Sequence, residues 1–181
     1  MSTKPTGESW RQVLMAALLL AAGISPLVSG QAQPNGTTPL PLTADDRAEI
    51  RQLVASYAHA LGTCAADDYA ALFTPDGRFS TTEFRVPKHR ELYGASATLQ
   101  GHAQLRELVQ TEEHCMKDAS PANRSPRSLP DLEIKPSPEG ATGKAHFAKD
   151  GWYEDVYVRT AEGWRFKSRM VFMPPRAGAE E

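Results

Sequence analysis

The chain has 181 residues, of which 40% are apolar, and its 20 Lys and Arg residues nearly balance 22 Asp and Glu residues, for a formal net charge of −2. This length and apolar fraction fit a globular domain of ordinary size. Basic and acidic residues are mixed, without a Lys/Arg block or a basic face interleaved with aromatic residues, which argues against nucleic-acid binding.

Residues 1–32 have the three regions of a secretory signal peptide. Lys4 and Arg11 lie in the first region, an apolar run interrupted only by small residues covers residues 13–24, and small side chains follow it. The apolar run is shorter than the ~20 residues that a membrane span needs, so we expect cleavage rather than an uncleaved anchor. The sequence therefore predicts a secreted or periplasmic protein without a membrane segment after signal cleavage.

The helical pattern begins after residues 33–42, a linker rich in Pro, Gly and Thr. Thr43 is expected to cap a helix over residues 44–61 that carries two Asp residues in its first turn. Apolar residues recur at helical spacing along one side of this helix: Ile50, Leu53, Val54, Tyr57 and Leu61. A short second helix over residues 67–73 and a turn at residues 74–77 follow.

The middle of the chain gives weaker signals. Residues 78–82 predict a short strand. Residues 83–99 have no sustained hydrophobic periodicity, so we expect them to form an irregular segment on the surface. Residues 102–113 predict another helix. Residues 116–127 contain Pro, Ser and Asn without periodicity and are expected to form a mobile loop.

Strand-forming residues dominate the last part of the chain. A hairpin is predicted over residues 129–134 and 141–148. Two long strands are predicted over residues 151–172, because both arms of this stretch are rich in aromatic and β-branched side chains. Helices first and antiparallel strands afterwards indicate an α+β domain over residues 43–173, with helices covering one face of a curved sheet. Residues 174–181 are expected to form a disordered tail.

The last two strands are expected to join at a tight turn at residues 160–163. Strict alternation in the second strand would place Trp164, Phe166, Ser168, Met170 and Phe172 on one face, and Arg165, Lys167 and Arg169 on the other. The first face is expected to be buried and the second to be exposed to solvent.

Two registers of this hairpin are open. In the one we favour, the cross-strand pairs are Arg159 with Trp164, Tyr157 with Phe166, Asp155 with Ser168, and Glu154 with Arg169. The last of these is an ion pair on the outer face, and it is the reason for the preference. A three-residue loop with a bulge at Gly163 is the alternative, and it would swap the faces of the first strand.

Two stretches carry a resemblance to a known family. Residues 57–79, YAHALGTCAADDYAALFTPDGRF, are similar to the opening of SnoaL-like proteins of the nuclear transport factor 2-like (NTF2-like) superfamily. Residues 136–147 and 152–172 look like the closing sheet of those proteins. The resemblance implies a cone-shaped α+β fold in which a curved antiparallel sheet wraps around N-terminal helices. It also implies a hydrophobic pocket, which in this superfamily serves polyketide cyclases, dehydratases, isomerases and proteins without a reaction.

The usual catalytic positions of the family are substituted here. Tyr57 stands where ketosteroid isomerase-like proteins place a phenol that donates to a substrate oxyanion. No carboxylate follows the turn that contains Asp76, Gly62 replaces an Asp of scytalone dehydratase-like proteins, and Arg127 or Ser128 replaces a His of many SnoaL-like members. The family's chemistry therefore cannot be copied onto this chain.

Asp155 lies between Tyr153 and Tyr157 on one expected face of the sheet. If an apolar inner face buries Asp155, the loss of water favours its protonated form and suits it as a catalytic proton shuttle, with Tyr57 or Tyr153 as the donor to a carbonyl or enolate. The alternative is that Asp155 forms a structural pair with a neighbouring Tyr or Arg and that Tyr57 is a core aromatic residue. The expected pocket lining is Tyr157, Trp164, Phe166, Met170 and His146, with solvent as the alternative environment of His146.

Cys64 and Cys115 could pair in an oxidising compartment. Closing a loop of ~50 residues would be worth roughly 4 kcal/mol on the chain-entropy account, and the alternative is that both residues are small buried hydrophobes. His114 and Cys115 are adjacent, which makes a poor ligand set, so no metal site is expected. No Gly-rich phosphate loop, nucleophile elbow or Walker-type lysine is present, so no cofactor is expected.

Two hypotheses for the function remain open. The first is a cofactor-free acid/base enzyme, a dehydratase (lyase), isomerase or polyketide cyclase-like protein that acts on a small hydrophobic carbonyl compound. The second is a non-catalytic periplasmic module that binds a small hydrophobic molecule or serves dimerisation. A homodimer through the outer face of the sheet is common in this superfamily, and Val156 and Val158 on that face are compatible with it.

Overall fold

The structure is a computed structural model, and it describes residues 38–116 and 129–174. The expected signal peptide at residues 1–32, the first part of the expected linker, most of the expected mobile loop and residues 175–181 of the tail lie outside the described residues. No helix among the described residues is long and apolar enough to cross a membrane.

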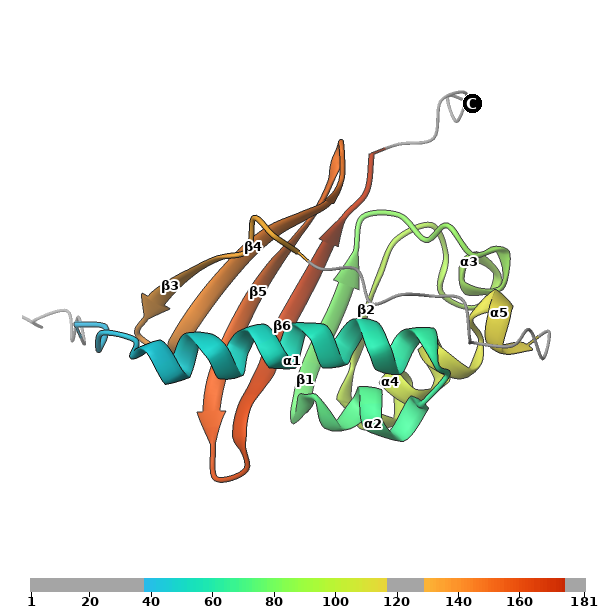
Figure 1. Cartoon of the computed structure of the whole chain (residues 1–181). Coiled ribbons are helices and arrows are strands. Elements are labelled where there is room, and N and C mark those ends of the chain that lie inside the picture. The colour runs from blue at the N-terminus through green and yellow to red at the C-terminus, as the bar shows by residue number, and fades with distance from the viewer. Residues whose placement is uncertain (1–37, 117–128, 175–181) are drawn as a thin grey trace, which may run out of the picture. The chain divides into compact units, whose positions relative to one another are not determined.

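A six-stranded sheet has the order β2-β1-β6-β5-β4-β3. Its strands are β1 (Phe73–Thr81), β2 (Ala97–Gln100), β3 (Glu133–Ser137), β4 (Gly140–Ala148), β5 (Gly151–Thr160) and β6 (Gly163–Phe172). All neighbouring strands are antiparallel except β1 and β6, which are parallel. Figure 1 shows the first helix crossing in front of the long strands β4, β5 and β6 and of β1.

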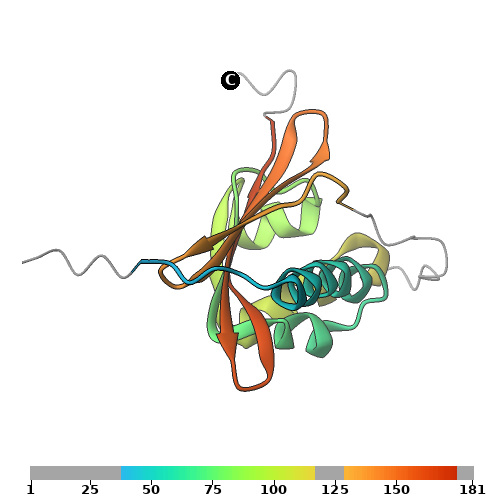
Figure 2. The same cartoon turned by 60° about the vertical axis from the view of Figure 1, so that its left-hand side comes forward.

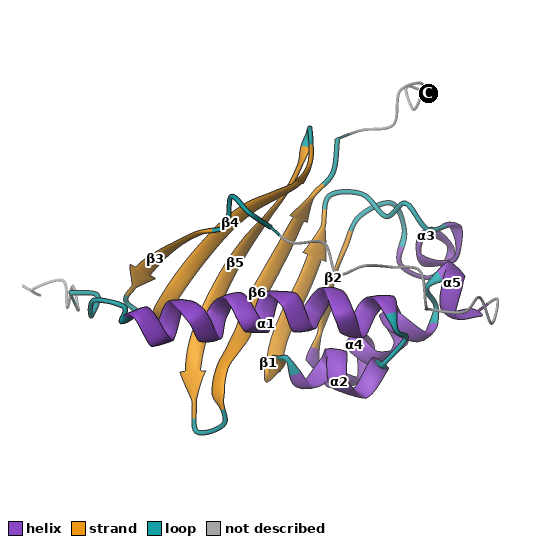
Figure 3. Cartoon of the chain, in the orientation of Figure 1, coloured by secondary structure: helices purple, strands orange, loops and turns teal. Residues whose placement is uncertain are grey.

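The helices precede the long strands β4, β5 and β6 along the chain, as the colours of Figure 1 show, and Figure 3 distinguishes the helices (purple) from the strands (orange). They are α1 (Ala44–Gly62), α2 (Ala66–Ala71), α3 (Pro87–Tyr93), α4 (Gly101–Gln110) and α5 (Glu113–Met116). Figure 2 shows α1 almost end-on, on one side of the sheet. The predicted α+β class, with a curved and unclosed sheet and N-terminal helices, is confirmed.

A capping box starts α1. The hydroxyl of Thr43 accepts a hydrogen bond from the backbone N–H of Asp46 at 3.0 Å, and the Asp46 carboxylate accepts one from the backbone N–H of Thr43 at 2.9 Å. Two otherwise unpaired amides are thereby satisfied. The helix buries one side, made up of Ile50, Leu53, Val54, Tyr57 and Ala60, and packs this side towards β6. The predicted apolar stripe is therefore the side that faces the sheet.

The middle of the chain is more regular than its sequence indicates. The expected surface crossing at residues 83–99 contains α3 and β2, and the expected helix at residues 102–113 is interrupted at Thr111. These elements have four to ten residues each, which is too short for a clear period. Strand β2 exists because Leu99 pairs with Phe79 of β1, and this contact between distant parts of the chain cannot be seen in a local pattern.

The hairpin of β5 and β6 contains a β-bulge at Lys167. Arg159 pairs with Trp164 and Tyr157 with Phe166, as the favoured register predicts, but Val156 then pairs with Ser168. Lys167 is thus an extra residue of β6 without a partner in β5, and every side chain of β6 after it lies on the face opposite to the one expected.

The bulge overturns the expected pairing and the expected faces of β6 beyond Lys167. Asp155 pairs with Arg169 instead of Ser168, and Glu154 pairs with Met170 instead of Arg169. Arg169 therefore points to the inner face, while Ser168 and Met170 point away from it. The expected ion pair between Glu154 and Arg169 is wrong, because Glu154 instead binds Lys144 of the adjacent strand at 3.1 Å.

The capping box generates a test of pH-dependent stability. We expect Thr43→Ala to lower the free energy of unfolding by about 1 kcal/mol at neutral pH, because the hydroxyl accepts from the backbone N–H of Asp46 and donates to the Asp46 carboxylate at 2.7 Å, and both of these hydrogen bonds are lost. The hydrogen bonds that the backbone N–H and the hydroxyl of Thr43 donate to the Asp46 carboxylate lower its pKa from 3.8 to about 2. The stabilisation is therefore present above the ordinary carboxyl value and is lost as the pH falls through about 2.

The measurement is urea denaturation of both proteins between pH 2 and pH 7, in which the difference should shrink on the acid side. Thr63→Ala is the matched control, because its hydroxyl donates to the carbonyl of His59 at the other end of α1 and involves no carboxylate. A Thr43→Ala difference that is the same at pH 2 and pH 7 contradicts the assignment.

Candidate functional site

A buried ion pair lies at the centre of the inner sheet face. Asp155 is 3% exposed and Arg169 is 1% exposed. The guanidinium donates from Nε to Oδ1 at 2.8 Å and from Nη2 to Oδ2 at 2.7 Å. Because the two residues are direct cross-strand neighbours, the fork of the guanidinium meets both carboxylate oxygens at once, which is the strongest geometry for such a pair.

The carboxylate of Asp155 receives a third donor from the side. The hydroxyl of Tyr157 donates to Oδ2 at 2.7 Å. The phenol reaches it by lying over Gly143 of β4, where an added Cβ would stand 2.6 Å from the Tyr157 hydroxyl. Gly143 is thus the residue that leaves room for this hydrogen bond, and both oxygens of Asp155 are occupied.

Aromatic rings surround the guanidinium of Arg169. Its central carbon lies 4.0 Å from the ring centroid of Tyr57, 4.3 Å from that of Phe166 and 4.4 Å from that of Tyr153. Such contacts with the faces of rings stabilise a cation that has lost its water. Among the described residues, the Nη1 atom of Arg169 has no hydrogen-bond partner, and the hydroxyl of Tyr69 on α2 has none other than the neighbouring phenol of Tyr57.

The charge state of the site follows from burial and from the ion pair. Burial alone would lower the pKa of Arg169, but the Asp155 carboxylate more than offsets this, and the pKa is raised above its usual value. Burial raises the pKa of Tyr57 and Tyr69. Burial and then the Asp155 charge raise the pKa of Tyr157 well above its ordinary value. At neutral pH the site therefore holds one cation and several neutral phenols that can donate.

The structure brings together most of the predicted site residues. Asp155, Tyr57 and Tyr153 meet around Arg169, and the predicted lining residues Tyr157 and Phe166 are fully buried beside them. The alternative interpretation of Asp155, a pair with a neighbouring Tyr and Arg, describes the contacts that the structure has. The phenols and the carboxylate share one face as expected.

Three predicted lining residues lie elsewhere. Met170 is on the opposite face because of the bulge. His146 is exposed, and its Nδ1 lies 2.8 Å from the carboxylate of Asp131. Trp164 is buried, but its indole N–H donates to Asp46 at the start of α1, at 3.1 Å. Sequence reasoning missed Arg169, since the alternation of β6 put it outside, and no local signal marked the bulge.

A separate groove of about 430 Å³ lies on the outer face of the sheet. It is lined by Glu133, Lys135, Thr142, Gly143, Lys144, Glu154, Asp155, Val156, Ser168 and Met170. Its charged residues are paired with one another, as in the contact between Lys144 and Glu154. The groove is therefore mixed in character, with an apolar floor from Val156 and Met170.

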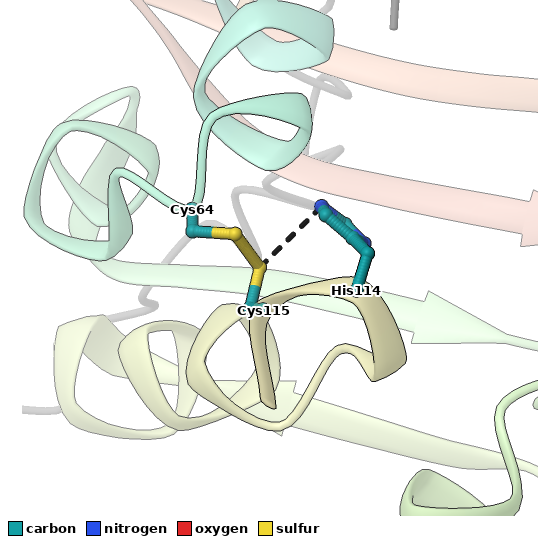
Figure 4. A group of neighbouring side chains, drawn as sticks. All are labelled: Cys64, His114 and Cys115. Carbon is teal, nitrogen blue, oxygen red and sulfur yellow. Dashed lines mark hydrogen bonds between the residues drawn. A yellow bond between two sulfur atoms is a disulfide. The ribbon is translucent and has the colours of Figure 1, made fainter. Parts of the chain in front are cut away.

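A disulfide joins Cys64, which follows α1, to Cys115 in α5, and it closes a loop with a sequence separation of 51 residues. The Nε2 atom of His114 lies 3.4 Å from the sulfur of Cys115, as Figure 4 shows. The two sulfurs and this imidazole are close enough for a metal site. Since the sulfurs are joined to each other, neither is a thiolate that could bind a metal ion.

The buried ion pair generates a test by double-mutant cycle. We expect Arg169→Met alone to lower the free energy of unfolding by about 3–5 kcal/mol, because it leaves the Asp155 carboxylate buried without a cation. Combining it with Asp155→Val should recover most of this loss, because no charge then remains inside. The measurement is urea denaturation of both single variants and the double variant.

The matched control is Glu154→Gln, one residue away on the opposite face. It breaks the exposed pair with Lys144 and should cost less than about 1 kcal/mol. Additive effects of Arg169→Met and Asp155→Val would show that the two residues do not depend on each other, contrary to the contacts described.

The sequence profile of the SnoaL-like domain family matches residues 42–170. No match was found among curated proteins. Solved structures with the same fold include an NTF2-like protein from Novosphingobium aromaticivorans, with 21% identity, a TM-score of 0.54, and coverage of 75% of this chain and 86% of that one. A protein of unknown function from Mycobacterium tuberculosis has 21% identity and a TM-score of 0.52, covering 76% and 81%.

ActVI-ORFA from Streptomyces coelicolor is similar at 19% identity and a TM-score of 0.51, covering 71% of this chain and 95% of that one. At these identities the structural likeness shows the fold alone. The family profile covers most of the chain, including both strands that carry the ion pair and the helix that covers it. The chain belongs to the SnoaL-like domain family.

Proposed function

We propose that this SnoaL-like domain binds a small, largely apolar molecule between α1 and the inner sheet face, with an oxygen of that molecule on Arg169. The observation that carries the proposal is the unpaired Nη1 atom of a guanidinium that is 1% exposed. A buried donor without a partner costs about 1–3 kcal/mol. A ligand oxygen at this place removes that cost, and the protein gains from binding it.

The surroundings of Arg169 define the chemistry of the ligand. Arg169 and Tyr69 both lie beside Tyr57, whose ring centroid is 4.0 Å from the central carbon of the guanidinium and 5.0 Å from the ring centroid of Tyr69. A guanidinium and a phenol both donate hydrogen bonds, so they bind a ligand oxygen that accepts them, as a ketone or a carboxylate does. The aromatic rings around them favour a ligand whose remaining part is apolar. The ligand class is therefore an apolar ketone or carboxylic acid.

Tyr153 marks the side from which a ligand reaches Arg169. Of the three rings around the guanidinium, those of Tyr57 and Phe166 are buried, while Tyr153 is half-buried. Tyr153 also packs on the half-buried Phe147, with ring centroids 4.5 Å apart. A rotation of these two side chains opens the way to Nη1 without any change in the backbone.

An acid/base enzyme is the second candidate function. In it, Arg169 and Tyr57 stabilise the enolate of a carbonyl substrate, and Asp155 shuttles the proton in a dehydratase, isomerase or cyclase reaction. The contact between Tyr157 and Asp155 supports it, because it links the carboxylate to a second proton carrier. Binding is placed first, since Asp155 already accepts three hydrogen bonds and a substrate proton would have to compete with Arg169 and Tyr157 for its oxygens.

Two further proposals concern the setting of the protein. Export to the periplasm or the outside of the cell is supported by the disulfide, since such bonds persist in oxidising compartments. A homodimer through the outer sheet face is supported by the groove there, where Val156 and Met170 are half-buried beside Lys144 and Glu154. A twofold axis would set the lysine of one copy against the glutamate of the other.

The binding proposal is tested with matched series of apolar carboxylic acids, ketones and hydrocarbons of the same shape. We expect acids and ketones to raise the melting temperature in a concentration-dependent way, and hydrocarbons to do so far less. Arg169→Lys should weaken binding about 10- to 100-fold, because a lysine cannot hold Asp155 and a ligand oxygen together. The measurement is calorimetric titration.

Arg159→Lys is the control, since Arg159 is an exposed arginine on the same strand pair that binds Asp46 and Glu49. Equal binding of hydrocarbons and acids, or an unchanged affinity of Arg169→Lys, contradicts the proposal. The bound compound also separates the two candidate functions. A ligand that emerges chemically unchanged after long incubation supports binding, whereas turnover that Asp155→Asn abolishes supports the enzyme.

The dimer is tested by light scattering at micromolar concentration, where we expect twice the mass of the chain. Val156→Glu should reduce the mass to that of one chain, because it places a charge in the apolar floor of the outer face. His59→Glu, on the exposed side of α1, should leave the dimer intact. A monomeric wild-type protein rules the dimer out.

A further inference from the structure

The disulfide between Cys64 and Cys115 has an imidazole against one of its sulfurs. The Nε2 atom of His114 lies 3.4 Å from Sγ of Cys115, and His114 is 7% exposed. Figure 4 shows the ring directed at this sulfur, from the same short helix that carries Cys115. The two ends of the disulfide thus stand in different chemical surroundings.

The hydrogen bonds of His114 fix a proton on the nitrogen that faces the sulfur. Nε2 lies 3.0 Å from the backbone carbonyl oxygen of Leu61, which can only accept, so Nε2 carries the hydrogen. Nδ1 has no partner among the described residues. The N–H is therefore shared between the carbonyl and the sulfur, and it is in place to donate to a thiolate on Cys115.

The carbonyl of Leu61 at the end of α1 holds the imidazole of His114 in place. Leu61 belongs to the last turn of the helix, where unpaired carbonyls carry partial negative charge and favour a positive group. A thiolate on Cys115 would accept the N–H of an imidazole that is held in this place by the helix end. Cys64 has no comparable donor in the group of side chains around the disulfide.

The backbone of Cys64 adds a second asymmetry. Its φ of +59° is the one positive value outside glycine among the described residues. The left-handed conformation is usual for the glycine that follows a helix, and it is unfavourable for a residue with a Cβ atom. Opening the disulfide at Cys64 frees this residue from one of the bonds that hold it there.

We propose that the disulfide is a thiol-exchange site, at which a low-molecular-weight thiol attacks Sγ of Cys64 and Cys115 leaves as a thiolate held by His114. The incoming thiolate forms a bond to the sulfur of Cys64, and the bond between the two protein sulfurs breaks, so the electron pair goes to Cys115. The product is a mixed disulfide at Cys64. A second thiol then releases Cys64, and the net change is reduction of the protein with oxidation of two thiols to their disulfide.

The chemistry of exchange explains why His114 sets the direction. Exchange is faster when the leaving sulfur is the better stabilised thiolate. Donation from Nε2 stabilises Cys115 alone, so attack at Cys64 is preferred over attack at Cys115. Both cysteines are only partly buried, which leaves the bond within reach of a small thiol.

The test treats the oxidised protein with reduced glutathione and follows opening by mass spectrometry after alkylation. We expect the glutathione adduct on Cys64, identified in its proteolytic peptide, and not on Cys115. His114→Phe should slow the opening about tenfold, since a hydrogen bond to a charged group is worth roughly a factor of ten. His114→Gln, which keeps an N–H donor, should recover part of the rate.

Whether His114→Phe slows or speeds the opening of the disulfide distinguishes the proposal from a purely structural role of His114. If the residue only packs the end of α1, His114→Phe loosens the region and the disulfide opens faster. His59→Phe, an exposed position on the same helix, is the control and should leave the rate unchanged. The proposal is overturned if the disulfide of His114→Phe opens at the same rate as that of the wild type or faster. A glutathione adduct on Cys115 also overturns it.

Discussion

The pair of Asp155 and Arg169 is the constraint on which the inner side of this domain depends. Burying two charges is favourable only if both are paired with good geometry, so the chain must hold β5 and β6 in one register. A slip of one residue would leave both charges without partners in an apolar layer. The bulge at Lys167 and the missing side chain of Gly143 are the local features that make the geometry possible. These two features belong to one register of β5 and β6, and that register brings Asp155 and Arg169 together.

The fold could be predicted well from the sequence, and the site only in part. The capped helix with its apolar stripe and the long aromatic strands are strong local patterns, and the resemblance supplied their order in space. Tyr153, Asp155 and Tyr157 were correctly expected to share a face of the sheet. Arg169 could not be found, because a bulge depends on neighbouring strands: β6 shifts where β1 beside it is also irregular, between Phe73 and Arg78.

The substituted family positions take on a consistent meaning once Arg169 is included. The polar centre of the inner face lies on β5 and β6, and the first helix contributes Tyr57 as an aromatic cover for the cation. An arginine that is permanently charged and tied to a carboxylate favours a fixed negative or partly negative oxygen in a ligand. It does not favour a group that must gain and lose a proton. This difference in chemistry is the physical reason for placing binding before catalysis.

Helix α1 is held at three places, and this limits how a ligand can enter. Asp46 at its start accepts from Arg159 and Trp164 of the sheet, Tyr57 in its middle covers Arg169, and Cys64 directly after its end is tied to α5. With all three contacts in place, the helix cannot lift away from the sheet, and access to the guanidinium depends on side chains such as Tyr153. Opening the disulfide removes the only covalent one of the three. Thiol exchange at Cys64 would therefore loosen the C-terminal end of the helix first, seven residues beyond the tyrosine that covers the buried cation.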